Sequence, residues 1–289
     1  MASSETTARY AVMGFPVRHS RSPFIHARFA QQTGQDLSYS AIEVEPGSFA
    51  AQVQDFFDRG GAGLNVTVPF KEEAWQLADV RSAQAESAGA VNTLFRDAEG
   101  RLHGANTDGI GLIRDIMLNH NGDIRGRRVL ILGAGGAVRG VLAPLLQQSP
   151  AALLIANRTL VRAERLAQLC RQDDFDAAAC DYEGLRARVD QGETFDLIIN
   201  GTSASLSGEL PPLPSRLVHV DTWCYDMMYA SADTPFQAWG RQQKAARSLD
   251  GSGMLVEQAA EAFWLWRGVR PDTAPVLQGL RELLSGTSR

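Results

Sequence analysis

The feature that most constrains the fold of this chain is an apolar run that ends directly in a cluster of glycines. Val129–Leu132 form the run, and Gly133-Ala134-Gly135-Gly136-Ala137 follow it without a break. Apolar side chains then recur at helical spacing, at Val138, Val141, Leu142 and Leu145. A glycine turn alone is a weak signal, but between a strand and a helix it is typical of nucleotide-binding α/β domains.

The glycine turn suits a pyrophosphate group. Gly133 permits the tight turn, and Gly135 lets the backbone approach the phosphates. The free N–H groups and the dipole of the following helix then hold them. The third position of the usual fingerprint is small, whereas here it is Val138. We expect this side chain to push the helix away from its strand without removing the phosphate cradle. The alternative is a tight turn that binds nothing.

The end of the next strand indicates which dinucleotide would bind. Leu153–Ala156 lead into Asn157-Arg158-Thr159, and Arg162 lies one helical turn beyond Arg158. No carboxylate stands where NAD-binding domains use one for the ribose hydroxyl. Two guanidinium groups and a hydroxyl suit the 2′-phosphate of NADP. A solvated basic helix start with Thr159 as its N-cap is the alternative, but cations are unfavourable at that end of a helix. NADP is therefore favoured.

The wider pattern predicts an α/β fold with two domains. A further buried strand, Leu197–Asn200, completes a doubly wound, Rossmann-type domain over 108–250. Residues 1–107 alternate between strand and helix, which predicts a second α/β domain. Its expected elements are Tyr10–Gly14, Pro23–Gln32 with Gly34 as terminator, Asn65–Val68, Glu72–Ala78 and Val91–Phe95. The C-terminal residues 251–289 are mainly helical and are expected to return to the first domain.

Composition excludes several classes of protein. The 289 residues are 44% hydrophobic and 21% charged with a net charge of −5, which indicates a soluble globular chain and gives no reason to expect nucleic acid. The cysteines and histidines lack the spacing of a disulfide framework or a metal site. Nothing resembles a signal peptide or a membrane span, so a cytoplasmic protein is expected.

Hydroxyl groups precede the first helix of the N-terminal domain. Ser22 fits the N-cap position with Pro23 at N1, and Ser20 is surplus to capping. A pair of hydroxyls at a helix N-terminus suits a carboxylate, and capping and binding are compatible.

A polar face follows on the strand that ends near residue 68. Asn65 and Thr67 alternate with Leu64, Val66 and Val68, and Pro69 stops the strand. Lys71 comes next, at the sheet edge where ligands bind in open α/β sheets. An ordinary surface lysine is the alternative.

Other polar residues stand where apolar ones are expected. Asn92 lies in an apolar strand and needs a partner if it is buried. Asp108 precedes a helix and either caps it or serves a site. Gln258 falls on the apolar stripe of a helix, so it either satisfies buried backbone or faces a polar pocket, and we favour the pocket.

Taken in order, these segments resemble the shikimate dehydrogenase family, almost from end to end. The matching segments are Gly14–Pro23, Asn65–Lys71, Gly89–Thr93, Asn106–Gly109, Gly133–Ala137, Asn157–Thr159 with Arg162, Tyr225–Tyr229 and Asp250–Gln258. The resemblance implies a substrate domain, 1–107 with 251–289, an NADP domain, 108–250, and reduction of 3-dehydroshikimate to shikimate.

The resemblance also implies roles for individual residues. Ser20 and Ser22 would hold the substrate carboxylate. The ring hydroxyls would be bound, beside Lys71, by Thr67, Asn92, Asp108, Tyr229 and Gln258. The NADP site would comprise Gly133, Ala134, Gly135, Gly136, Ala137, Asn157, Arg158, Thr159, Arg162, Met227 and Gly251. Lys71 and Asp108 would be the catalytic pair that handles the proton accompanying hydride transfer, and the sequence leaves open which of them moves it.

Some positions depart from the family pattern, and other functions compete. The departures are Ala83, Ala105, Val138 and Gly201–Ser205, and they make a paralogue with altered cofactor affinity a competing interpretation. A quinate/shikimate dehydrogenase paralogue is one rival, against which both serines and the arginine pair argue. A non-catalytic NADP-binding regulator is another, and it would need neither Lys71 nor Asp108. A monomer or a homodimer is expected.

Overall fold

The computed structural model describes residues 7–171, 175–202, 204 and 208–286. They form two compact units: unit 1 comprises the residues to Gly111 together with Val256–Leu280, and unit 2 comprises Leu112–Leu255 and the residues from Arg281. These borders lie a few residues from those expected at 107 and 250, and the end of the chain groups with unit 2. Ser203 and Ser205, two of the departing positions, lie outside the described residues.

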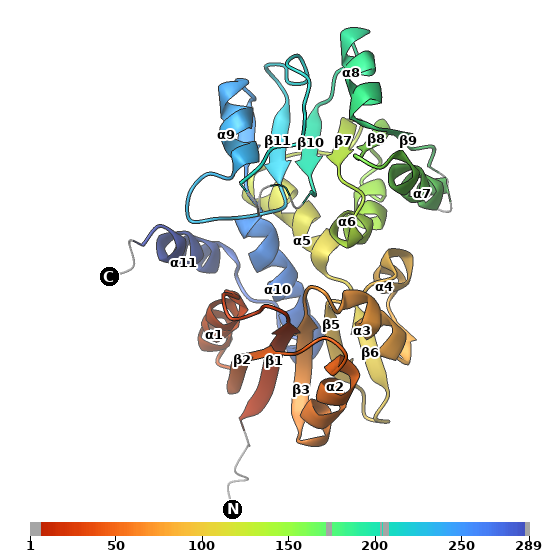
Figure 1. Ribbon diagram of the computed structural model, residues 1–289. Helices are drawn as coiled ribbons and strands as arrows, with labels where there is room; N and C mark the ends of the chain where they lie inside the picture. Colours follow the sequence, from red (N-terminus) through yellow and green to blue (C-terminus); the bar gives the residue numbers. More distant parts are fainter. Residues whose placement is uncertain (1–6, 172–174, 203, 205–207, 287–289) are drawn as a thin grey trace, which may run out of the picture. The chain divides into compact units, whose positions relative to one another are not determined.

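Unit 2 contains a parallel sheet with strands in the order β12-β11-β10-β7-β8-β9 (Figure 1). Its strands are β7 (Arg128–Leu132), β8 (Ala152–Ala156), β9 (Ala178–Cys180), β10 (Leu197–Asn200), β11 (Trp223–Asp226) and β12 (Arg247–Leu249). The strand order reverses between β7 and β10, as in a doubly wound nucleotide-binding sheet. The predicted Rossmann-type fold is confirmed.

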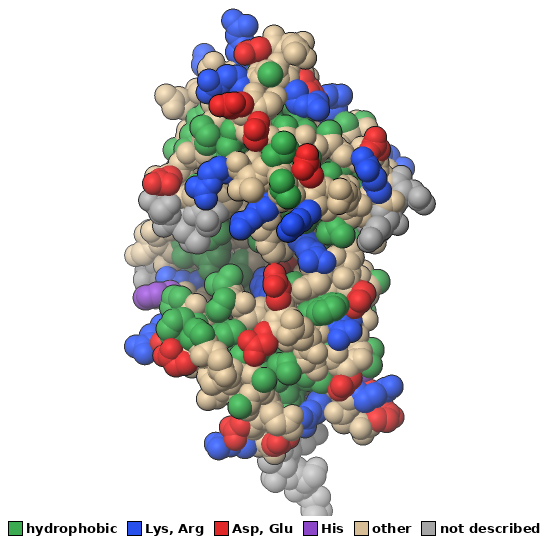
Figure 2. Space-filling model, turned by 45° about the vertical axis from the view of Figure 1, so that its right-hand side comes forward, with side chains coloured by type: hydrophobic (Ala, Val, Ile, Leu, Met, Phe, Trp, Pro, Cys, Tyr) green, Lys and Arg blue, Asp and Glu red, His purple; other side chains and the backbone are tan. Residues whose placement is uncertain are grey.

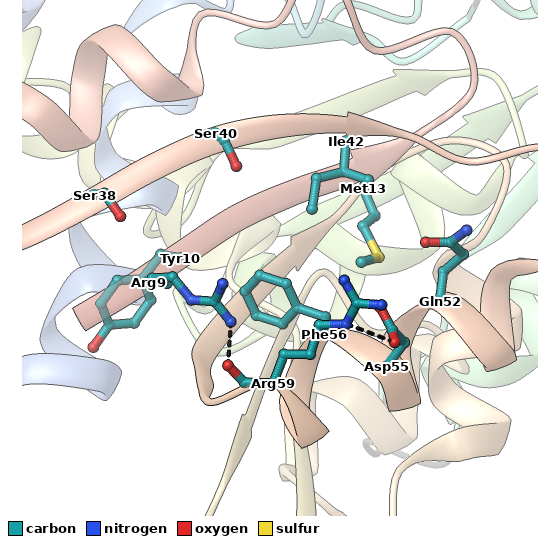
Figure 3. A pocket seen from close by; sticks show the side chains of 10 residues that line it. All are labelled: Arg9, Tyr10, Met13, Ser38, Ser40, Ile42, Gln52, Asp55, Phe56 and Arg59. Carbon is teal, nitrogen blue, oxygen red and sulfur yellow. Dashed lines mark hydrogen bonds and ion pairs between the residues drawn. The ribbon is translucent and has the colours of Figure 1, made fainter. Parts of the chain in front are cut away.

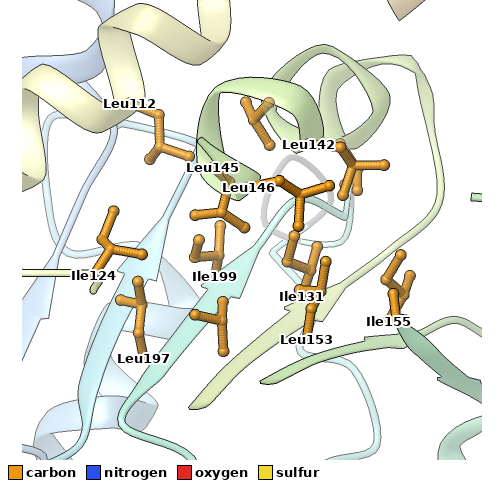
Figure 4. Packing of buried hydrophobic residues seen from close by; sticks show 14 of the residues in the cluster. Leu112, Ile124, Ile131, Leu142, Leu145, Leu146, Leu153, Ile155, Leu197 and Ile199 are labelled. Atoms are coloured by element: carbon orange, nitrogen blue, oxygen red, sulfur yellow. The ribbon is translucent and has the colours of Figure 1, made fainter. Parts of the chain in front are cut away.

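Helices cover both faces of this sheet, because parallel strands are apolar on both sides. They are η1 (Asp115–Asn119), α6 (Gly136–Leu146) and α7 (Leu160–Cys170) on one face, and α8 (Tyr182–Asp190) and α9 (Pro235–Gln242) on the other. In Figure 4, Leu142 and Leu145 of α6 lie over Ile131 and Ile199 of the sheet. This packing fixes the start of α6 at the end of β7.

Unit 1 contains a mixed sheet in the order β2-β1-β3-β5-β6-β4. Its strands are β1 (Ala8–Gly14), β2 (Leu37–Glu43), β3 (Gly61–Val66), β4 (Val80–Arg81), β5 (Thr93–Arg96) and β6 (Leu102–Ala105). The pairs β3–β5 and β5–β6 are antiparallel and the others parallel. The helices that follow the strands are α1 (Ser22–Thr33), α2 (Phe49–Asp58), α3 (Lys71–Leu77), α4 (Ala83–Ala88) and the start of α5 (Asp108–Arg114).

The C-terminal helices α10 (Ser252–Arg267) and α11 (Ala274–Leu284) contribute residues to unit 1. The Trp266 ring stacks on Tyr10 of β1 at 4.7 Å between centroids, and Phe263 meets Phe29 of α1 edge to face at 5.7 Å. Aromatic contacts of this kind contribute beyond the area that they bury. They tie the last helical segment to the first strand and the first helix.

Two expected strands have different bounds in the structure. β3 ends at Val66, so Val68 does not share the buried face predicted for it and is 62% exposed. The chain turns there, because the carbonyl of Val68 accepts from the Phe15 amide and Pro69 cannot continue a strand. β5 begins at Thr93, so Asn92 precedes the strand rather than lying within it.

The surface carries mixed charge. Figure 2 shows Lys and Arg side chains interspersed with Asp and Glu over the visible face. Among the described residues, no helix combines the length and the apolar character that crossing a membrane requires.

Candidate functional site

Lys71 and Asp108 form an ion pair in unit 1. Lys71 is the first residue of α3, Asp108 is the first residue of α5, and Nζ lies 2.6 Å from Oδ2. Their side chains are 25% and 12% exposed, so Lys71 is not an ordinary surface lysine. Asp108 is the first residue inside α5 and not the N-cap residue before it, and Oδ1 of Asn106 accepts its backbone N–H at 3.1 Å. The ion pair is therefore partly shielded from solvent.

Asn92 joins this pair. It is only 3% exposed, and its amide Nδ2 donates to Oδ1 of Asp108 at 2.8 Å and to Oγ1 of Thr107 at 2.9 Å. The carboxamide therefore has the partners that burial demands. Gln258 lies beside them, with Oε1 at 3.4 Å from Asn92 Nδ2 and 3.3 Å from Thr107 Oγ1. The interpretation that Gln258 faces a polar group agrees with these contacts.

The serine pair lies at the start of α1 in a different way from that expected. Ser22 is the first residue of the helix and Arg21 holds the N-cap position without a side-chain bond, so the prediction that Ser22 is the N-cap is wrong. Arg21 already has helical dihedral angles (φ −91°, ψ −4°), which moves the helix start back by one residue. Ser20, thought surplus, accepts from the Ser22 amide at 3.3 Å. Both hydroxyls thus remain at the helix N-terminus.

Thr67 follows β3 and is half-buried. Its methyl group packs against Gly14, where a Cβ would lie 2.4 Å from Thr67 Cγ2. In the part of the chain that the structure describes, no hydrogen bond links the Thr67 hydroxyl to the Lys71 cluster.

In unit 2 the glycine turn is open. Gly133 has a positive φ of 104° and donates its N–H to the carbonyl of Ala156 at 2.8 Å. Gly135 and Gly136 begin α6 and are exposed, and a Cβ on either would meet nothing within 4 Å. The N-cap residue Gly135 has no side chain to bond the first N–H groups of α6. The residues present fit a pyrophosphate.

The arginines that follow β8 are exposed. Among the described residues, neither Arg158 nor Arg162 forms an ion pair with a carboxylate. Thr159 is at the N-cap position of α7, but its hydroxyl makes no cap bond. Asn157 shapes the turn by donating to the carbonyl of Thr159 at 2.9 Å. Two unneutralised guanidinium groups beside a helix N-terminus fit a phosphate better than a solvated helix start.

The segment after β11 carries Met227 and Tyr229, both half-buried. Gly251 is adjacent: its N–H donates to the carbonyl of Met228 at 2.9 Å, and a Cβ there would lie 2.3 Å from Met227 O. Only glycine therefore permits this approach.

Asp226, which is fully buried, holds this segment. It accepts from Asn200 Nδ2 at 3.1 Å, from the Met228 amide at 3.1 Å and from Thr234 Oγ1 at 2.6 Å. Sequence reasoning missed Asn200 and Asp226. Their signal was a polar residue at the end of each of two adjacent apolar strands.

The departures from the family pattern have identifiable neighbours. Val138 is fully buried, and its Cγ2 lies 2.3 Å from the point where a Cβ on Gly201 would be. Gly201 thus leaves the space that Val138 fills, and these two departures fit one another. Ala83 begins α4 behind the cap Ser82, and Ala105 ends β6.

A hollow of about 240 Å³ lies in unit 1, away from the predicted site residues (Figure 3). Its charged residues already have partners, since Arg9 donates to the carbonyl of Arg59, and Arg59 pairs with Asp55 at 2.9 Å. None of the predicted site residues lines it.

Together, a doubly wound sheet with an open glycine turn and a shielded Lys–Asp–Asn cluster in one chain define a nucleotide-linked α/β dehydrogenase. Family models agree over most of the chain. Residues 12–94 match the shikimate dehydrogenase substrate binding domain, 115–207 match shikimate / quinate 5-dehydrogenase, and 251–281 match the shikimate 5′-dehydrogenase C-terminal domain. The chain belongs to the shikimate dehydrogenase family.

Comparisons with individual relatives agree with this family assignment. Shikimate dehydrogenase (NADP(+)) of Hahella chejuensis is 55% identical over 273 residues, which are 94% of this chain and 98% of that protein. The crystal structure of an Ael1 enzyme from Pseudomonas putida has a TM-score of 0.87 at 48% identity and covers 94% of this chain and 98% of its own. Shikimate 5-dehydrogenase from Thermus thermophilus, in complex with NADP(H) and shikimate, has a TM-score of 0.82 at 31% identity, covering 95% and 99%.

Proposed function

We propose that this chain catalyses the reversible, NADPH-linked reduction of 3-dehydroshikimate to shikimate, a step of aromatic amino acid biosynthesis through chorismate. The observation that carries the proposal is the Lys71–Asp108 ion pair with Asn92 bonded to it, in a chain that is 55% identical to a shikimate dehydrogenase (NADP(+)). An ammonium group beside a carboxylate is suited to handle the proton that accompanies hydride transfer.

Unit 2 binds NADP. The N–H groups at the start of α6, in the turn from Gly133 to Ala137, hold the pyrophosphate. Arg158 and Arg162, with Thr159, hold the 2′-phosphate, while Met227 and Gly251 line the remainder of the site. When bound, the cofactor supplies the hydride from C4 of its nicotinamide ring. Two observations support this assignment: the open space around Gly135 and Gly136, and the lack of a carboxylate partner for either arginine within the described part of the chain.

The substrate is held by polar side chains that bind its carboxylate and its ring hydroxyls. Ser20 and Ser22 donate to its carboxylate at the N-terminus of α1, a position that favours an anion. The ring hydroxyls are bound by Thr67, Asn92, Asp108, Gln258 and Tyr229. Residues to 107 with 251–289 thus act as the substrate domain and 108–250 as the NADP domain.

Lys71 is the group that gives the proton to the ketone oxygen in the reductive direction. Both carboxylate oxygens of Asp108 already accept, Oδ1 from Asn92 at 2.8 Å and Oδ2 from Lys71 at 2.6 Å. In this arrangement the carboxylate accepts hydrogen bonds through both oxygens, whereas an ammonium group can only donate. The ammonium of Lys71 keeps its other N–H bonds for the substrate, and Asp108 orients it.

A direct assay tests the proposal. Formation of NADPH from shikimate and NADP is followed by absorbance, with quinate and NAD as the alternative substrate and cofactor. We expect turnover with shikimate and NADP and much weaker turnover with the other combinations. Comparable rates with quinate or NAD identify the broader quinate/shikimate paralogue. Cofactor binding without any turnover identifies a non-catalytic regulator and refutes the proposal.

The remaining expectations concern the state of the protein. We place it in the cytoplasm as a monomer or homodimer. Cys170, Cys180 and Cys224 are buried and form no disulfide with one another, which suits a reducing compartment.

A further inference from the structure

Three polar side chains of unit 1 that have no role in the proposed reaction connect the serine end of the site to Asn92. They are Tyr39 on the edge strand β2, Asn65 on β3 and Thr93 at the start of β5. The Tyr39 hydroxyl lies beside the Ser22 hydroxyl and donates to Oδ1 of Asn65 at 2.7 Å. Asn65 and Thr93 are 6% and 0% exposed, so their hydrogen bonds are made within the protein.

The direction of each hydrogen bond between Tyr39 and Asn92 follows from which groups can only donate or only accept. Nδ2 of Asn65 lies 3.2 Å from the backbone carbonyl of Asn92, which can only accept, so the amide nitrogen must face it. The same nitrogen lies 3.1 Å from Oγ1 of Thr93. Thr93 therefore accepts from Asn65, and its single hydroxyl proton remains for another partner.

That partner is Oδ1 of Asn92, 2.9 Å from Oγ1 of Thr93. The same oxygen accepts the backbone N–H of Thr107 at 2.9 Å, a group that can only donate. The NH₂ end of Asn92 must then point to Asp108. All the hydrogen bonds from Tyr39 to the Asp108 carboxylate thus run in one direction. Hydrogen bonds in such a series polarise and strengthen one another.

We infer that Thr93 is a positioning residue for the proton-transfer pair, acting through the Asn92 amide. The inference rests on the proposed function, since it assigns Thr93 to the Lys71–Asp108 pair. Valine has the same branched shape and would suit the start of a strand, but it would remove one of the two acceptors of Asn65 Nδ2 and one of the donors to Asn92 Oδ1. The hydroxyl, rather than the bulk of the side chain, carries the role.

The matched variants Thr93→Val and Thr93→Ser test this role. Thr93→Val keeps the shape and removes the hydroxyl, and kcat for shikimate oxidation should fall about tenfold, the effect of losing roughly one hydrogen bond. Thr93→Ser keeps the hydroxyl and should stay within about twofold of the wild type. The KM for NADP should be unchanged in both, because the proposed cofactor residues belong to unit 2. Equal losses in both variants, or an unchanged kcat in Thr93→Val, overturn the inference.

Two further measurements separate positioning from a general loss of structure. In an Asn92→Ala background, adding Thr93→Val should leave kcat where Asn92→Ala alone puts it, whereas a further tenfold loss contradicts action through Asn92. Nitrogen-15 NMR of the Asn92 side-chain amide, identified by its loss in Asn92→Ala, needs no activity. Its protons should exchange with solvent slowly in the wild type and in Thr93→Ser, and much faster in Thr93→Val. An unchanged exchange rate overturns the inference even if the wild type proves inactive, which by itself would refute only the proposed reaction.

Discussion

Replacing Gly201 by alanine tests how the altered glycine turn is accommodated. A Cβ at this position would lie 2.3 Å from Cγ2 of Val138, whereas carbon atoms in contact are normally about 3.5–4.0 Å apart. Gly201 does not have a left-handed φ, so the strain comes from this contact and not from the backbone. The Met227 sulfur, at 3.1 Å, is the end of a flexible side chain and can move. Val138 is fully buried, and a β-branched side chain in a helix has essentially one rotamer.

The expected magnitude follows from overpacking. To restore contact distance, α6 must move by about 1 Å or more from the end of β10, and overpacking of this kind costs about 1–3 kcal/mol. Because α6 begins with the proposed phosphate cradle at Gly135 and Gly136, Gly201→Ala should also weaken NADP binding. Val138→Ala alone leaves a cavity and should cost about 2 kcal/mol. In the double variant the new methyl group occupies part of that space, so the loss should be at least about 1 kcal/mol smaller than the sum.

Urea unfolding and NADP titration of the four proteins measure both effects. Gly279→Ala is the matched control, because its Cβ would lie 3.4 Å from Phe24, an ordinary contact, within helix α11. It should be neutral or slightly stabilising, as alanine is the better helix former. A Gly201→Ala variant as stable as the wild type, or losses that simply add in the double variant, would show that Val138 and Gly201 do not compensate one another.

Three further predictions concern charge and protons. Arg158→Ala with Arg162→Ala should weaken NADP binding far more than NAD binding, because only NADP has the 2′-phosphate, and equal losses in titrations with both cofactors would refute the assignment. Lys71→Ala should lower kcat by about 10²–10⁴-fold with a smaller change in the KM for shikimate, and a change confined to KM would contradict proton transfer by Lys71. Burial lowers the pKa of His26 from 6.5 to about 3, so below pH 6.5 the unfolded chain binds a proton that the folded chain excludes, and stability falls as the pH falls. His26→Phe keeps a flat ring stacked on Tyr39 and removes the titratable ring nitrogens. Between pH 6.5 and about 4.5 the wild type should lose roughly 2–3 kcal/mol more stability in urea unfolding than His26→Phe, and parallel losses would refute this account.

The unit 2 fold was predictable because its signals are local and agree with one another. An apolar strand, a glycine turn and an amphipathic helix adjoin in the chain from Val129 to Leu145, and right-handed parallel crossovers leave few arrangements for such units. The exposed arginines after β8 were predictable for the same reason, since their place at a strand end is set by the nearby sequence. The way in which the helix accommodates Val138 was not predictable, because it depends on Gly201, which follows a different strand.

The unit 1 cluster was only partly predictable. Asn92 and Gln258 stood out as polar residues in apolar surroundings, and Lys71 and Asp108 stood out by their places after a strand and before a helix. Gln258, however, is 166 residues from its neighbour Asn92, and no periodicity reveals that contact. The cap at Ser22 was misplaced because the dihedral angles of Arg21 decide where the helix begins, and residue preferences do not fix them. Tyr39 could not be recognised from the sequence, because it lies on the edge strand β2, of which several residues are exposed, and the sequence does not show which of them face inward.

The residues missed from the sequence share a physical property that explains why they were missed. Thr93, Asn200 and Asp226 are buried polar groups whose partners lie on neighbouring strands or on the segments that leave them. Burying each of these groups costs free energy unless a hydrogen-bond partner is in place. Its role is therefore set by the strand register, which places that partner, and not by its own position in the sequence. Register is a property of the whole sheet. A polar residue at the end of a buried strand is therefore a sound signal that a network exists, while the atoms that complete the network become known only once the strands are aligned.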